Sequence, residues 1–132
     1  MSTGSVVFTQ AHVFDGEQFL DGPRDVVVRD GVVEEVGAGI GADQRFADIE
    51  RRVDVGGATL LPGLTDLHVH VAVNDAGDLG HVSEPFSLGY YRSVQNMALT
   101  LEQGITSVRD AGGAELGARV AVERGYVEGP RL

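Results

Sequence analysis

The spacing of hydrophobic residues changes near residue 62. Before it, apolar residues form short β-branched runs, as in SVVFTQAHVF at 5–14 and in the two runs on either side of Asp30-Gly31. An Asp-Gly pair between two such runs predicts a tight hairpin, because glycine accepts the positive φ of a type I′ turn. With RRVDVGGATLL at 51–61 as further strand material, the pattern predicts a small antiparallel sheet.

Beyond residue 62, strand patterns and helix patterns alternate along the chain. This order is typical of parallel strands joined by crossover helices, which is the α/β class. A polar, glycine-rich loop of unusual length separates the first strand from the first helix, and such loops often carry function. The expected elements are a strand at 64–73, a helix at 87–103, a strand at 105–110 and a helix at 114–125.

The composition narrows the classes of partner. The 132 residues carry a formal net charge of −10, which repels phosphate backbones and anionic lipids, so we expect no nucleic acid and no membrane as partner. There is no cysteine, which excludes disulfides and thiolate metal sites. No basic-then-apolar leader and no apolar run of roughly 18 residues is found, and we expect a cytoplasmic protein.

Ionisable side chains occupy every second position of the stretch DLHVH, which begins at Asp66. Strict alternation along a strand predicts that Asp66, His68 and His70 share one face, with next-but-one Cα atoms about 6.5–7 Å apart, and that Leu67 and Val69 face the other way. Two imidazoles at this separation can share a zinc ion, and a carboxylate beside them can orient a ring. An isolated His-x-His also arises by chance, but the preceding aspartate and the position at the carboxyl end of a strand favour a metal site.

Three further side chains are candidates for the mouth of this site. His81 lies in the loop after the strand, and Arg109 and Asp110 end the second expected strand. A solvated loop histidine is the simpler interpretation of His81. For Arg109 and Asp110, a mutual or local ion pair that fixes the turn is an equally good interpretation.

The stretch LLPGLTDLHVHV resembles the first barrel strand of the metal-dependent amidohydrolase superfamily, in which a proline-glycine turn leads from a small β-sandwich into the barrel. TLEQGITSVRDAGG and the terminal GPRL are similar to the next stretches of one branch, the imidazolonepropionase-like and Xaa-Pro dipeptidase (prolidase-like) proteins. The resemblance implies that residues 1–61 form the N-terminal β-sandwich portion. Residues 62–132 would then form the first two βα units of an incomplete (β/α)8 TIM-type barrel, which takes about 250 residues when complete.

The resemblance also implies a site and a chemistry. His68 and His70 would bind a divalent metal, most simply zinc, in a site of one or two ions, with Asp66 as a supporting residue. In the family a bridging carboxylated lysine, two further histidines and a late aspartate complete the site, but this chain contains no lysine. The implied activity is hydrolysis of a C–N bond in an amide, cyclic amide or dipeptide-like substrate by metal-activated water. We expect the chain to be inactive without a segment that supplies the missing barrel strands.

Two other interpretations stay open at this point. The chain could be a non-catalytic binding or assembly module whose His-x-His is a relic, or a small metal-binding protein that completes its site across a homodimer. The strand at 105–110 would lack a neighbour in this chain, which predicts an exposed edge where a missing segment or a partner docks.

Overall fold

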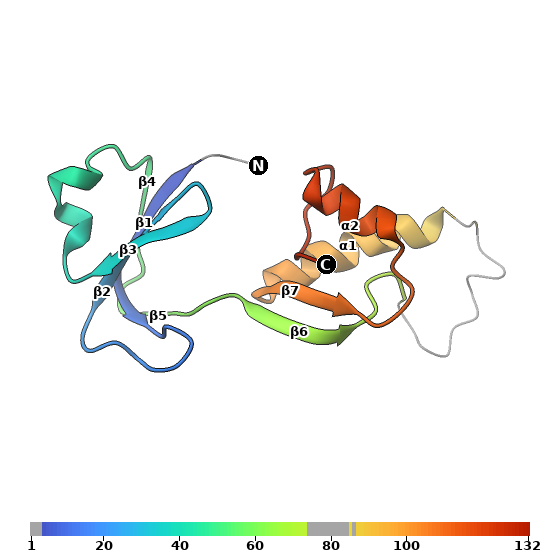
Figure 1. The fold of residues 1–132 in the computed structure, drawn as a ribbon, viewed down its shortest axis with the longest axis horizontal. Coiled ribbons are helices and arrows are strands. Elements are labelled where there is room, and N and C mark those ends of the chain that lie inside the picture. The colour runs from blue at the N-terminus through green and yellow to red at the C-terminus, as the bar shows by residue number, and fades with distance from the viewer. Residues whose placement is uncertain (1–3, 74–84, 86) are drawn as a thin grey trace. The chain divides into compact units, whose positions relative to one another are not determined.

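The computed structural model describes residues 4–73, 85 and 87–132, which separate into two compact units (Figure 1). Unit 1 is Met1–Pro62 and unit 2 is Gly63–Leu132. Unit 1 consists of strands and two short 3-10 turns, whereas unit 2 alternates strand and helix. The predicted α/β class is confirmed. No helix in the described part of the chain is long and apolar enough to cross a membrane.

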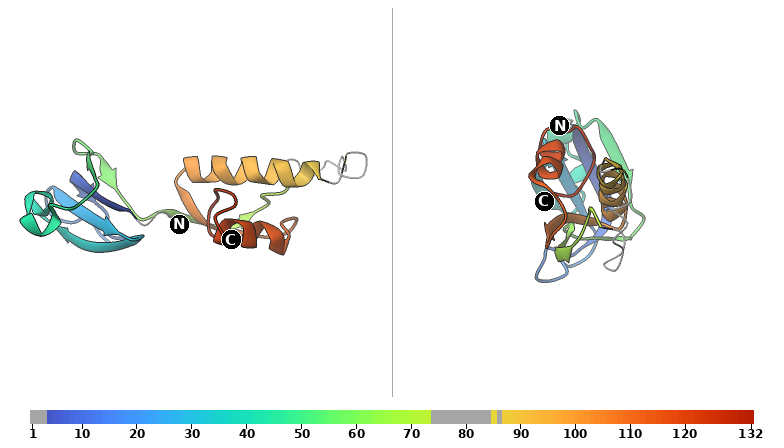
Figure 2. Two further views of the ribbon diagram at one scale, coloured as in Figure 1. Left: turned by 90° about the horizontal axis from the view of Figure 1, so that it is seen from above. Right: turned by 90° about the vertical axis from the view of Figure 1, so that its right-hand side faces the viewer.

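Unit 1 is a five-stranded sheet in the order β3-β2-β1-β4, with β5 also pairing with β1 (Figures 1 and 2). Asp30 and Gly31, with φ angles of 52° and 78°, form the tight hairpin between β2 and β3 that the sequence predicts. The elements are β1 (Ser5–Val13), β2 (Arg24–Arg29), β3 (Val32–Gly37), β4 (Arg51–Asp54) and β5 (Thr59–Leu60), with the 3-10 turns η1 (Ile40–Ala42) and η2 (Gln44–Phe46).

The prediction that this sheet is antiparallel is wrong for two of its strands. β1 pairs with β2 in the antiparallel sense, but β4 and β5 both pair with β1 in the parallel sense. Parallel neighbours need a longer connection than a hairpin turn provides. The chain between β3 and β4 supplies such a connection by passing through η1 and η2, and β4 then enters along the free side of β1.

A buried carboxylate ties this connection to the sheet. Asp25 is 4% exposed, and its two oxygens accept hydrogen bonds from the backbone N–H of Gln10, at 3.1 Å, and of Gly41, at 2.9 Å. Gln10 has a positive φ of 60° within the register shift between Phe8 and Ala11. Asp25 therefore satisfies two backbone donors where regular pairing is interrupted.

Unit 2 is built around two parallel strands, β6 (Leu64–Val69) and β7 (Ile105–Asp110). Two helices, α1 (Leu88–Glu102) and α2 (Leu116–Glu123), follow them in the alternation that the sequence predicts. The described side chains that are buried here are Val71, Met97, Val108, Ser93 and Pro130.

The outer edge of β7 is partly covered by the chain's own last residues. Arg131 forms an isolated parallel bridge with Ser107, in which its N–H donates to the carbonyl of Thr106 and its carbonyl accepts from the N–H of Val108. These hydrogen bonds are 2.9 and 2.8 Å long. The expectation of a fully exposed edge along 105–110 is therefore wrong at this point, because Arg131 already occupies the place of a third strand.

Gly63 offers a test of the packing at the start of β6. A Cβ at this position would lie 2.7 Å from the Cβ of Thr106, which rotation of the threonine side chain cannot relieve. We expect Gly63→Ala to lower the free energy of unfolding of unit 2 by about 1–3 kcal/mol, as overpacking does elsewhere. Denaturant unfolding, followed through amide resonances of β6 and β7, measures the change.

The control is Gly117→Ala in α2, where a Cβ has open space around it. Because alanine is the better helix former, this variant should match the wild type or exceed it by up to about 1 kcal/mol. Adding Thr106→Ala to the Gly63→Ala chain should restore part of the loss. Equal destabilisation by both glycine substitutions would contradict the steric explanation.

Candidate metal site

The two histidines of the DLHVH stretch lie together at the carboxyl end of β6. His68 is within the strand and His70 directly follows its last residue. The centroids of the two imidazole rings are 5.3 Å apart and the ring planes are inclined by 66°. At this separation, nitrogen atoms of both rings can reach one ion at the roughly 2.0–2.1 Å typical of zinc. The structure thus brings together the two residues that the sequence singles out.

Asp66 lies where the pairing of β6 with β7 is irregular. Along the β6 and β7 ladder, Asp66 pairs with Val108, whereas Val69 pairs with Asp110. Three steps on β6 therefore match two steps on β7, which makes the ladder irregular beside Asp66. Thr65 and Leu67, the two neighbours of Asp66, line one hollow of unit 2, so side chains alternate as expected up to Leu67.

The carboxylate of Asp66 has a local partner instead. It accepts a hydrogen bond of 3.0 Å from the backbone N–H of His68, two residues further on. This contact fixes the backbone at the bulge rather than the ring of a histidine. Asp66 thus supports the site through the main chain.

The ring of His70 is held by a backbone carbonyl across the sheet. Its Nδ1 lies 2.7 Å from the carbonyl oxygen of Gly112, in the turn after β7. A carbonyl only accepts, so neutral His70 must carry its proton on Nδ1, and this leaves the lone pair of Nε2 available. Metal-binding histidines commonly have their second nitrogen anchored in this way. His70 can therefore present the lone pair of Nε2 to a divalent ion.

Asp110 ends β7 beside this anchor, and its carboxylate accepts hydrogen bonds from three backbone N–H groups. One carboxylate oxygen accepts from the N–H of Gly112 at 2.8 Å and of Ala114 at 3.3 Å, and the other accepts from the N–H of Val71 at 2.8 Å. Of the two interpretations that the sequence left open, the structure supports a residue that fixes the turn. The fixing is done by backbone hydrogen bonds and not by a pair with Arg109.

Two imidazoles are fewer protein ligands than a zinc site usually has. Among the residues that the structure describes, no group of three or more histidine, aspartate or glutamate side chains could hold a metal ion. His81, the third candidate of the sequence, lies outside the described residues. The described part of the chain therefore offers two candidate imidazole ligands, His68 and His70.

A tyrosine and a glutamate join the first turns of the two helices. The pKa of Tyr90 is raised above its ordinary value, first by loss of solvent around the hydroxyl, and then by a hydrogen bond to Glu115 and the negative charge of that carboxylate. In this hydrogen bond the hydroxyl of Tyr90 is the donor, because a carboxylate only accepts. The neighbouring Tyr91 is 72% exposed and does not pack into a core.

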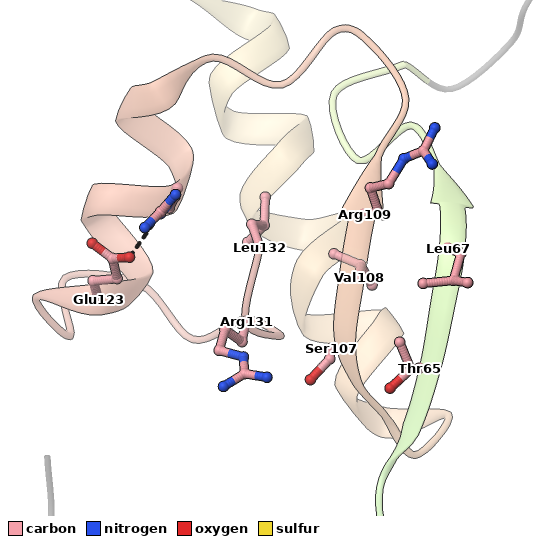
Figure 3. Close-up of a pocket in the computed structure, with 9 residues that line it drawn as sticks. Thr65, Leu67, Ser107, Val108, Arg109, Glu123, Arg131 and Leu132 are labelled. Carbon is pink, nitrogen blue, oxygen red and sulfur yellow. Dashed lines mark hydrogen bonds and ion pairs between the residues drawn. The ribbon is translucent and has the colours of Figure 1, made fainter.

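A hollow of about 390 Å³ lies elsewhere in unit 2 (Figure 3). Figure 3 shows Arg131 and Leu132 between α2 and β7, with Arg109 at the far end of β7. Neither His68 nor His70 lines this hollow, so the hollow is separate from the candidate metal site. Arg109, a candidate for the mouth of that site, lines the hollow. The lining residues are Thr65, Leu67, Ser107, Val108, Arg109, Arg119, Glu123, Arg131 and Leu132.

The sequence did not identify the carbonyl of Gly112 as a partner of His70. Every residue except proline carries the same backbone donor and acceptor, so no residue type marks a functional carbonyl. In the sequence, the glycine pair that follows β7 is the feature that could have indicated an unusual turn here. Gly112 and Gly113 have φ angles of 154° and 105°, and a Cβ on Gly113 would lie 2.8 Å from Val73.

Comparison with known proteins shows similarity to one protein family. The profile that describes the amidohydrolase family matches residues 59–132. A dihydroorotase from Geobacter sp. (strain M21) is 37% identical over 93 residues, which is 67% of this chain and 20% of the relative. The chain therefore spans about a fifth of the length of this curated relative.

Solved structures show the same similarity over nearly the whole chain. The crystal structure of an amidohydrolase has a TM-score of 0.82 and 35% identity, covering 97% of this chain and 30% of that one. The crystal structure of a prolidase complexed with N-methylphosphonate-L-proline has a TM-score of 0.78 and 35% identity, covering 96% of this chain and 30% of that one. Both units of this chain thus have counterparts in larger proteins.

Proposed function

The chain belongs to the amidohydrolase family, and from this premise we propose that it supplies part of the metal site of a hydrolase that acts on C–N bonds. The observation that carries the proposal is the pair of imidazole rings 5.3 Å apart, one of them anchored through Nδ1 by the carbonyl of Gly112. Nothing about an ordinary strand requires this anchor. A ring that must present Nε2 to an ion does require it.

His68 and His70 would hold a divalent metal, for which zinc is our proposal. When bound, such an ion supplies Lewis-acid chemistry, lowering the pKa of water and polarising a carbonyl. The chain's own residues position the ligands. Gly112 keeps the proton of His70 on Nδ1, and Asp66 fixes the backbone N–H of His68.

The substrate class that we propose is an amide, a cyclic amide or a dipeptide-like compound. Support comes from the relatives named above, a dihydroorotase and a prolidase. The remaining ligands would come from a segment that completes the barrel beyond the described βα units. We accordingly propose that this chain alone does not hydrolyse amides.

Metal titration of the purified chain tests the first half of the proposal. The wild-type chain should bind Zn²⁺ or Co²⁺ weakly, with the ion perturbing the ring resonances of His68 and His70 in NMR spectra. The His68→Ala, His70→Ala double variant should lose this binding in isothermal titration calorimetry. Two neutral imidazole nitrogens are the minimum that fixes the ion in one place.

The matched control is His12→Ala, which removes an exposed histidine from unit 1 and should leave metal binding unchanged. Equal binding by all three chains would contradict the proposed site and favour the alternative, a non-catalytic binding or assembly module with a relic His-x-His. Metal-dependent amide hydrolysis by the wild type, absent in the double variant, would contradict the proposal that the chain alone is inactive.

A further inference from the structure

We propose that Asp110 is the positioning residue for His70, fixing the imidazole so that Nε2 faces the metal. The proposal rests on the proposed function, since it concerns a ligand of that site. It assigns to Asp110 a role beyond closing a turn, and it makes the orientation of one metal ligand depend on a carboxylate on the neighbouring strand.

The contacts of Asp110 reach both places that determine where the His70 ring lies. One oxygen accepts from the N–H of Val71, at 2.8 Å, and Val71 directly follows His70 in the chain. The other oxygen accepts from the N–H of Gly112, at 2.8 Å, and the carbonyl of Gly112 binds His70 Nδ1 at 2.7 Å. The carboxylate therefore holds the backbone that carries the ring and the backbone that anchors it.

The turn after β7 needs hydrogen bonds to a residue outside it to keep one conformation. Gly112 and Gly113 have φ angles of 154° and 105°, in a region that side chains other than glycine rarely adopt. Free glycines have many alternative conformations, so the carbonyl of Gly112 points at His70 only while the turn is restrained. Hydrogen bonds from two residues of the turn, Gly112 and Ala114, to one oxygen of Asp110 provide the restraint.

The role requires a carboxylate rather than any polar group of that size. An ionised carboxylate is acceptor-only and has lone pairs for several donors, which matches the three N–H groups around Asp110. An asparagine has one acceptor oxygen, and its NH2 group would face either Val71 or the turn as a donor against a donor. Asp110→Asn preserves the volume of the side chain but removes the hydrogen bonds of one carboxylate oxygen, either to Val71 or to the turn.

The test compares the ring tautomer of His70 in the metal-free wild-type chain and in Asp110→Asn, using two-bond ¹H–¹⁵N correlation spectra at a pH where the rings are neutral. The wild-type ring should carry its proton on Nδ1. In Asp110→Asn the proton should shift toward Nε2, and affinity for Co²⁺ should fall by about 10- to 100-fold, the range known for partners of metal ligands. A role confined to stabilising the turn would leave the tautomer unchanged.

The matched control is Asp54→Asn in unit 1. Asp54 also accepts from a backbone N–H two residues on, that of Gly56 at 2.9 Å, but it lies in the other unit. This variant should change neither the tautomer nor the Co²⁺ affinity. A wild-type His70 protonated on Nε2, or an Asp110→Asn chain with unchanged tautomer and affinity, would overturn the proposal.

Two further outcomes have defined meanings. If Asp110→Asn fails to fold, Asp110→Glu replaces it, because the longer side chain keeps the charge but displaces the carboxylate from its positions against Val71 and Gly112. A mixture of tautomers in that variant supports the proposal, and a ring protonated only on Nδ1 overturns it. If the wild-type chain binds no metal, the proposed function fails, and the metal-free tautomer comparison still judges the role of Asp110.

Discussion

Replacing Asp25 by alanine is expected to lower the free energy of unfolding of unit 1 by about 2–5 kcal/mol. The substitution leaves the backbone N–H groups of Gln10 and Gly41 without their acceptor. A buried donor that loses its partner, as Gly41 would, costs about 1–3 kcal/mol, and the part-buried N–H of Gln10 adds to this loss. Gly41 is buried, so water cannot easily replace the carboxylate there.

The expected loss of stability is large relative to the total free energy of unfolding of a unit of this size. A domain of about 60 residues has a stability of roughly 3–9 kcal/mol at 0.05–0.15 kcal/mol per residue. We therefore expect a measurable unfolded population of unit 1 in Asp25→Ala at 25 °C. The measurement is denaturant unfolding followed separately through amide resonances of β1 and β2 and through those of unit 2, which should keep its wild-type transition.

Asp15→Ala is the matched control for this prediction. Its carboxylate also accepts from two backbone N–H groups, those of Glu17 and Gln18, each at 2.8 Å, but it is exposed to solvent. Water replaces the lost acceptor at such a position, so the midpoint of unfolding should move far less than in Asp25→Ala. Similar shifts in both variants would show that burial of the Asp25 carboxylate is not what makes it important.

Local sequence features predicted the parts of this fold that depend on neighbouring residues. Asp30-Gly31 formed the predicted hairpin because both residues adopt the positive φ that the turn requires. The strand at 105–110 and the helix ending before Gly104 follow from periodicity and from a glycine that terminates a helix. Proximity of His68 and His70 follows from the two-residue repeat of a strand.

Features that depend on register and on distant backbone were not predictable in the same way. The bulge between Asp66 and Val69 depends on how β6 aligns with β7, which no residue type in DLHVH marks. Parallel pairing of β4 with β1 depends on the path of the whole connection before it. The anchor of His70 is a carbonyl 42 residues away, supplied by a group that nearly every residue has.

Together these features show why the site needs both strands. The histidines belong to β6, but the groups that orient His70 belong to β7 and the turn after it. Asp66, also on β6, accepts a hydrogen bond from the backbone N–H of His68. The ligand pair is therefore a property of the paired strands, and its geometry should be lost when their packing on α1 is lost.

Met97→Ala is expected to have the largest effect in unit 2, lowering the free energy of unfolding by about 2–5 kcal/mol, the usual cost of truncating a fully buried side chain. Met97 is 1% exposed in the middle of α1. The chain near Gly129 packs so closely on it that a Cβ there would lie 3.2 Å from the Met97 sulfur. Truncation leaves a cavity that the surrounding chain fills only in part.

The effect should extend to the candidate metal site, because the residue before Met97 connects α1 to the chain that directly follows His70. The side-chain amide of Asn96 donates to the carbonyl of Val71 at 2.9 Å, and Val71 follows His70. We expect faster amide hydrogen exchange at Val71 and Gly112 in Met97→Ala, measured beside the loss of stability. Leu99→Ala, which truncates a side chain of α1 that is 48% exposed, is the control and should change both quantities little. Equal effects from the two substitutions would mean that burial under α1 does not support the histidine pair.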